Sequence, residues 1–186
     1  MTEIADDVVA EHIRIADLLE EVGPEAPAGV DDWTTADLAA HLVWQLAAGG
    51  LLVLPGRVLL VRGFHLTIRA TSSSSNRLDA RYRRKGSGTA IQSLRKGPPR
   101  LLLRDMVAPV ALFEVWVHHD DIRRANQLAP PAEPETLGHA VDFALRCQRK
   151  ALGSTMVDRG VWNGELIRWL AGRPSTLPAH SPPLRF

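Results

Sequence analysis

The chain has 186 residues, of which 45% are hydrophobic, and this suits one globular domain with a sizeable core. Its 22 Lys and Arg residues nearly balance 21 Asp and Glu residues, so the whole-chain charge gives no reason to expect a nucleic-acid or anionic-membrane partner. The single cysteine, Cys147, excludes an internal disulfide framework and a Cys-rich zinc site, and a metal would therefore need nitrogen and oxygen ligands.

No stretch of the sequence has the pattern of a signal peptide or a membrane span. The opening MTEIADD lacks a basic start and an apolar run. The longest apolar stretch, around Leu51 to Val61, is interrupted by Pro55, Gly56 and Arg57 and is too short to cross a bilayer. We therefore expect a soluble, cytoplasmic protein.

The first predicted element is an amphipathic helix over residues 4–22, which Gly23 and Pro24 end. His12 lies on or beside its apolar stripe, and we interpret it as a partly buried or surface histidine rather than a ligand. The stripe consists of residues near helical spacing: Ile4, Val8, Val9, Ile15, Ala16, Leu19 and Val22.

A second helix is predicted from Thr34 to about Leu54. Thr34 and Asp37 have the spacing of a capping box, which sets the start of this helix. His41 lies at the edge of its broad apolar face. Taken alone, His41 would be a hydrogen-bonded core histidine, but the helix over residues 106–124 suggests another role.

A connection of about twenty residues, 55–75, is long enough to travel the length of a helical bundle. A third helix is predicted over 76–96, with an interruption at 86–88. It contains many basic residues, which we interpret as a solvated face; the alternatives are a site for a substrate carboxylate or a weak nucleic-acid patch. These residues are Arg77, Arg81, Arg83, Arg84, Lys85, Arg95 and Lys96, with Arg100 following.

The segment over residues 106–124, MVAPVALFEVWVHHDDIRR, predicts a helix through the middle of the fold, beginning near 101–105 and ending at 120–126. Its apolar part contains one carboxylate, Glu114, and an ionised carboxylate in a core costs several kcal/mol unless it is paired, protonated or bound to a metal. At about 100° per residue, Glu114, His118 and Asp121 lie within roughly 60° of one another. His119 points about 100° away from His118.

A further amphipathic helix is predicted over 133–152, and a short turn or helix over 163–170 precedes a proline-rich end. The fold class is therefore all-α.

These patterns suggest a metal centre. A catalytic zinc site keeps three protein ligands and one open position, and His41, Glu114 and His118 form such a set from two helices. Asp121 is a candidate for orienting the ligands. An E-x-x-x-H spacing is a modest signal, and its apolar surroundings give it weight. The alternative is that Glu114 and His118 pair with each other in a structural protein that binds no metal.

Two segments, WTTADLAAH (33–41) and EVWVHHDDIRR (114–124), resemble the mycothiol-dependent maleylpyruvate isomerase family of the DinB-like metal-binding superfamily. The resemblance covers roughly residues 1–152 and implies a four-helix bundle with a long crossover between helices two and three. It also implies metal ligation by His41, Glu114 and His118. We expect a DinB-like bundle over 1–155 and a short C-terminal appendage over 156–186. The full isomerases carry a second, α/β domain, and about thirty residues after the bundle are too few for one.

The resemblance implies a metal-dependent enzyme, with zinc as the expected ion and mycothiol or another low-molecular-weight thiol as the cofactor. A thiol deprotonated by the cation would add to a small electrophilic, conjugated substrate, and an isomerase would then expel it whereas an S-transferase would release the adduct. Asp121 or His119 would orient ligands or move protons. The alternative is a non-catalytic metal-binding bundle that has lost its substrate domain. The sequence leaves the substrate unidentified and leaves a homodimer open.

Overall fold

The computed structural model describes residues 2–46, 86–105, 107–152 and 162–177. These ranges contain no β-strand, and the all-α prediction is confirmed for them. The connection over 55–75, the end of the second predicted helix and residues 76–85 lie outside the described ranges, so the four-helix bundle with its long crossover stays a prediction. The helices are α1 (Glu3–Val22), a helix over residues 35–46, α3 (Ser87–Arg95), α4 (Ala108–Ala125), α5 (Leu137–Leu152) and α6 (Asn163–Leu170).

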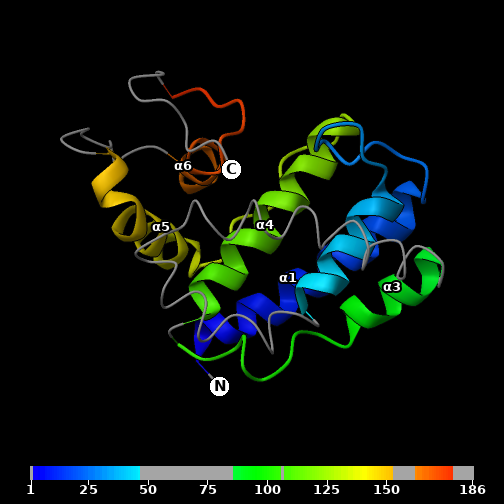
Figure 1. Cartoon of the computed structure of the whole chain (residues 1–186), viewed down its shortest axis with the longest axis horizontal. Coiled ribbons are helices and arrows are strands. Elements are labelled where there is room, and N and C mark those ends of the chain that lie inside the picture. The colour runs from blue at the N-terminus through cyan, green and yellow to red at the C-terminus, as the bar shows by residue number, and fades with distance from the viewer. Residues whose placement is uncertain (1, 47–85, 106, 153–161, 178–186) are drawn as a thin grey trace.

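Helix α4 is the central element of the described structure. It runs between α1 on one side and α5 and α6 on the other, while α3 flanks α1 (Figure 1). Most of its side chains are buried, including the consecutive polar residues 118–121. The prediction that this helix runs through the middle of the fold is therefore confirmed.

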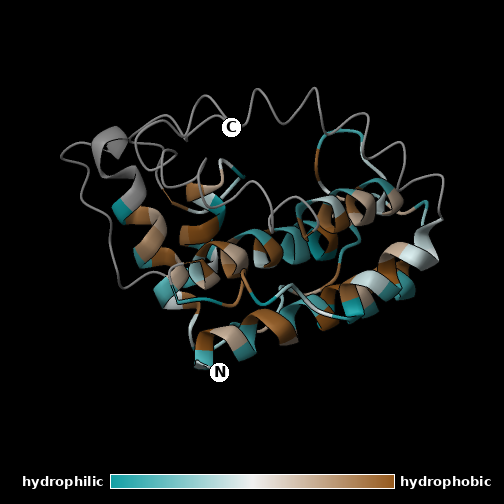
Figure 2. Ribbon diagram, turned by 60° about the horizontal axis from the view of Figure 1, so that its bottom comes forward, coloured by the Kyte–Doolittle hydropathy of each residue, from teal (hydrophilic) through white to brown (hydrophobic). Residues whose placement is uncertain are grey.

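Two hydrophobic clusters pack against α4. The first joins the start of α1 to α4, α5 and α6 through residues such as Val8, Leu112 and Leu137. The second joins the later part of α1 to helix 35–46 and α3, with Val115 and Ile122 contributed by α4. The described helices carry both hydrophobic and hydrophilic residues, as expected for amphipathic helices that each bury one side (Figure 2). Helix α4 thus contributes residues to both clusters.

The N-terminal capping of helix 35–46 follows the sequence prediction. The Thr34 backbone N–H and hydroxyl both donate to Asp37 Oδ2 at 3.0 Å, and the Asp37 N–H donates to Thr34 Oγ1 at 3.3 Å. These bonds satisfy donors that the first helical turn leaves free. They therefore fix the first turn of the helix that carries His41.

Two helices begin later than the sequence predicted, and a third, α3, begins within a predicted interruption. Helix α4 begins at Ala108 because turns occupy the preceding residues, and Pro109 is accommodated in its first turn. Helix α5 begins at Leu137, after Pro134, and the Glu133 carboxylate accepts the Gly164 N–H at 2.6 Å. Helix α3 begins at Ser87, where an interruption was predicted, after Gly86 with a φ of 83°.

Helix α6 is part of the hydrophobic core. Leu166 and Ile167 are fully buried, and both belong to the cluster that α4 and α5 form. Gly164 lies where an added Cβ would be 2.6 Å from the Trp116 ring, so the start of α6 is packed tightly against α4. Residues that the sequence placed in an appendage therefore contribute to the core.

None of the helices in the described ranges combines the length and apolar character that a membrane span requires.

Candidate functional site

The side chains of His41 and His118 lie next to each other between helix 35–46 and α4. Their ring centroids are 5.8 Å apart, with an angle of 80° between the rings. The Nδ1 atoms of both rings are buried and have no hydrogen-bond partner within the described ranges. A buried polar atom without a partner costs free energy, so these two nitrogens have unused bonding capacity.

Tryptophan rings enclose His41. The Trp33 ring meets it edge-on at 5.2 Å, and the Trp44 ring lies 5.9 Å away. Burial, and secondarily the neighbouring His118, lower the pKa of His41 to about 3. The imidazole is therefore neutral at physiological pH, which is the form that ligates a metal.

Glu114 lies one helical turn before His118, but its side chain is only half-buried. The prediction of a carboxylate inside the core is wrong, because Glu114 lies beside helix 35–46 rather than in either hydrophobic cluster. Its Oε2 accepts a hydrogen bond from Gln45 Nε2 at 3.5 Å, and Gln45 is one turn after His41. The energetic argument for a metal at Glu114 is correspondingly weaker.

The predicted ligand set is partly assembled. Two imidazoles are adjacent, and the Glu114 carboxylate is linked to the helix that carries His41. As the side chains stand in the described ranges, however, no three His, Cys, Asp or Glu side chains form a group that could hold a metal ion.

Asp121 connects His118 to the C-terminal segment. Its Oδ2 is 3.7 Å from His118 Nδ1, and its side chain is almost fully buried. Arg173 Nε donates to both Asp121 oxygens, at 2.9 and 3.2 Å, and Arg168 Nη1 lies 3.5 Å from Oδ1. Residues after the predicted bundle therefore fix the carboxylate nearest to His118.

The same charged network continues along α4. Asp120 is fully buried and accepts hydrogen bonds from Arg124 Nε, at 2.9 and 3.1 Å, and from Arg168 Nη1. Arg124 Nη2 also donates to Glu165 at 2.9 Å. Although burial acts in the opposite direction, hydrogen bonds from Thr176 and the charge of Arg124 lower the pKa of Glu165.

His119 lies on another side of α4, as the helical angle predicted, and faces α1. Its Nδ1 contacts the carboxylate of Glu11, which is fully buried and also accepts a hydrogen bond from Arg14 at 3.1 Å. His12, predicted as partly buried or exposed, is buried, and its Nδ1 donates to the Val8 carbonyl at 2.8 Å.

Several residues of this region were not singled out from the sequence. Trp44 and Gln45 follow His41 by three and four positions, and this spacing could have placed them on its helical face. Glu11 has the same spacing from the core residues Val8 and Ile15, so it could have been recognised as buried. No local pattern identifies Arg168 or Arg173, because their partners on α4 are distant in sequence.

The part of the basic third helix that the structure describes has the predicted solvated character. Arg95 is exposed and donates to Asp17 at 2.8 and 3.1 Å, and also to Glu20. Lys96 and Arg100 are exposed as well. Arg77 to Lys85 lie outside the described ranges.

Comparison with protein-family models, curated proteins and solved structures finds no match to this chain. The resemblance to the maleylpyruvate isomerase family therefore stays a prediction that rests on the two sequence segments.

Proposed function

We propose that the protein binds a divalent metal, with zinc as the expected ion, and acts as a thiol-dependent isomerase or S-transferase-like enzyme on a small electrophilic substrate. His41, Glu114 and His118 would hold the ion. The observation that carries this proposal is the pair of adjacent imidazoles whose buried Nδ1 atoms form no hydrogen bond within the described ranges.

The residues present fit such an ion chemically. Two imidazoles and one carboxylate are a common ligand set for catalytic zinc. A bound cation would supply the positive charge that favours the thiolate form of a thiol cofactor. The rings of Trp33 and Trp44 lie against His41, and the Asp121 carboxylate lies 3.7 Å from His118 Nδ1 without a hydrogen bond between them.

One observation favours an enzyme over the alternative, a non-catalytic metal-binding bundle. A structural zinc site is closed by a fourth protein ligand, and Asp121 is the carboxylate closest to His118. Both Asp121 oxygens already accept hydrogen bonds from Arg173, so Asp121 is not a free ligand. A coordination position would then remain open for the thiol.

The metal is tested by elemental analysis of the purified wild-type protein and of His41→Ala, Glu114→Gln and His118→Ala. We expect about one equivalent of zinc in the wild type and a loss in each variant, because a catalytic site has three protein ligands. His139→Ala is the matched control, since His139 is exposed on α5. Circular dichroism would verify that each variant is folded. A wild type that stays metal-free after incubation with zinc, nickel and manganese would refute the metal centre.

A second measurement separates the enzyme from the non-catalytic alternative. The cobalt-substituted protein is titrated with mycothiol and with simpler thiols, and a thiolate-to-cobalt absorption band is expected if the metal has an open position. Metal binding without any such band would favour the non-catalytic bundle.

A further inference from the structure

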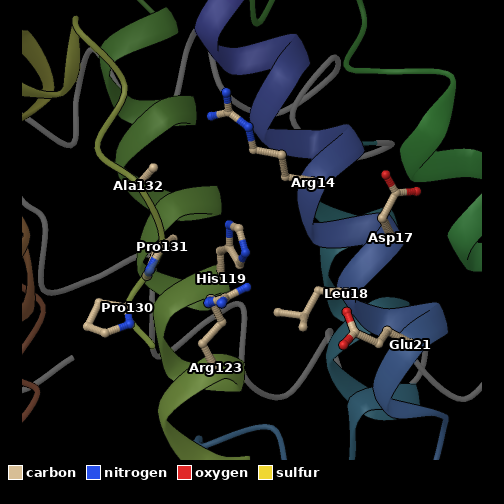
Figure 3. Close-up of a pocket in the computed structure, with 9 residues that line it drawn as sticks. All are labelled: Arg14, Asp17, Leu18, Glu21, His119, Arg123, Pro130, Pro131 and Ala132. Carbon is tan, nitrogen blue, oxygen red and sulfur yellow. The ribbon is translucent and has the colours of Figure 1, made fainter. Parts of the chain in front are cut away.

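A second candidate site lies on the other side of α4, between α1 and the segment over residues 130–132. The structure has a pocket of about 310 Å³ here, and its lining includes Arg14, Leu18, His119 and Arg123 (Figure 3). This volume is at the lower end of the range for small-molecule sites. None of the proposed metal ligands lines this pocket.

Two of the lining side chains, His119 and Arg14, contact the same buried carboxylate on α1. His119 is almost fully buried, and its Nδ1 contacts the Glu11 carboxylate, which has no solvent exposure. Arg14 bonds to the other Glu11 oxygen at 3.1 Å through one of its terminal nitrogens.

The walls carry charges of both signs, and two of the charged groups, Arg123 and Glu21, form no ion pair within the described ranges. Arg123 Nε donates to the Ala129 carbonyl, while the terminal nitrogens of its guanidinium form no hydrogen bond or ion pair within the described ranges. Glu21, on α1, likewise has no ion-pair or hydrogen-bond partner there. Asp17 also lines the pocket but already pairs with Arg95. The available groups are therefore one guanidinium on α4 and one carboxylate on α1.

Leu18 lies between these charges in Figure 3, and Pro130, Pro131 and Ala132 add apolar surface at the opposite wall. A simple anion would be attracted by Arg123 and repelled by Glu21, and a simple cation would experience the reverse. A small molecule with both a carboxylate and an ammonium group would gain from both side chains.

We infer that this pocket binds a small zwitterion of the amino-acid class, with its carboxylate at Arg123 and its ammonium group at Glu21. Arg14 also lines the pocket, but its guanidinium is bonded to Glu11 and lies on the far side of His119 from Arg123 in Figure 3, so the ligand carboxylate is assigned to Arg123 alone. The inference goes beyond the proposed function and does not depend on a metal.

The test is a protein-observed NMR titration of the full chain with four probes. L-norvaline carries its carboxylate and ammonium groups on the same carbon, and γ-aminobutyrate carries them at opposite ends of its chain. Butyrate and butylammonium carry one charge each. We expect at least one zwitterion to shift the amide signals of residues 14–21 and 119–132, with an affinity at least about tenfold above either singly charged probe. The titration is run with and without zinc, so its failure leaves the metal measurement unaffected.

Two variants locate the site. Arg123→Gln and Glu21→Gln should each weaken zwitterion binding about tenfold, because each removes one charge contact. Arg100→Gln and Glu3→Gln change exposed residues outside the pocket and should leave binding unchanged. The inference is overturned if neither zwitterion binds, if butyrate or butylammonium binds equally tightly, or if the two pocket variants bind like the wild type.

Discussion

The buried pair of Asp120 and Arg168 should contribute strongly to the stability of the fold, and Asp120→Asn tests this. The Asp120 side chain has no solvent exposure, and that of Arg168 has 7%. The substitution removes the carboxylate charge but leaves the guanidinium buried. Removing one partner of a buried pair typically costs about 3–5 kcal/mol. Asp121 lies 3.5 Å from Arg168 and compensates it in part, so we expect a loss of about 3 kcal/mol.

A matched control is available at the surface. Asp17 accepts hydrogen bonds from Arg95 with similar geometry, but the two side chains are 60% and 37% exposed. Water and salt screen such a pair, so Asp17→Asn should change the stability too little to resolve. The comparison separates the effect of burial from the effect of forming an ion pair.

The assay is urea and thermal denaturation followed by far-ultraviolet circular dichroism at neutral pH. A loss of about 3 kcal/mol in a chain of this size corresponds to a fall in Tm of about 6–12 °C. If Asp120→Asn destabilises the protein no more than Asp17→Asn, Arg168 is not held as a buried charge, and our account of the C-terminal segment is wrong.

Three further substitutions test packing, the helix preference of Ala over Gly, and pH dependence. Gly164→Ala should cost about 1–3 kcal/mol, because its Cβ would lie 2.6 Å from the Trp116 ring. Gly88→Ala places a methyl group in open space on α3 and should stabilise the protein by up to about 1 kcal/mol. Similar denaturation curves for the two variants would contradict the tight packing of Gly164 against Trp116. Burial lowers the pKa of His12 below its ordinary value of 6.5. As the pH falls below 6.5, His12 takes up a proton in the unfolded chain but not yet in the folded one, so the free energy of unfolding decreases. His12→Gln should make the free energy of unfolding less dependent on pH in this range, by at most about 1.4 kcal/mol per pH unit. Denaturation at several pH values measures this dependence, and an unchanged dependence would refute the buried, neutral state of His12.

The local features of the fold could be predicted from the sequence. Helical spacing of apolar residues identified α1 and the central position of α4, and the pair of Thr34 and Asp37 identified the start of helix 35–46. The starts of α4 and α5 were predicted too early. In both cases prolines and distant contacts decide the boundary, as when Glu133 accepts a hydrogen bond from Gly164 instead of beginning a helix.

The candidate site was predictable where it depends on helical faces. His41 and His118 were expected to share a site because both lie at apolar faces, and their rings are adjacent. The burial of Glu114 was overestimated, since an apolar run does not show which side of a helix lacks a neighbour. Arg168 and Arg173 were missed because only the folded chain brings them to Asp120 and Asp121.

The consecutive residues from His118 to Asp121 divide their contacts among three neighbours. His118 meets helix 35–46, His119 meets α1, and the two aspartates meet the C-terminal segment. Each side chain could be replaced singly at the cost of its own contact. Inserting or deleting one residue just before His118 would instead rotate all four by about 100° and break every contact together. In natural variants of this chain, we therefore expect the spacing from Trp116 to Asp121 to vary less than the residues themselves.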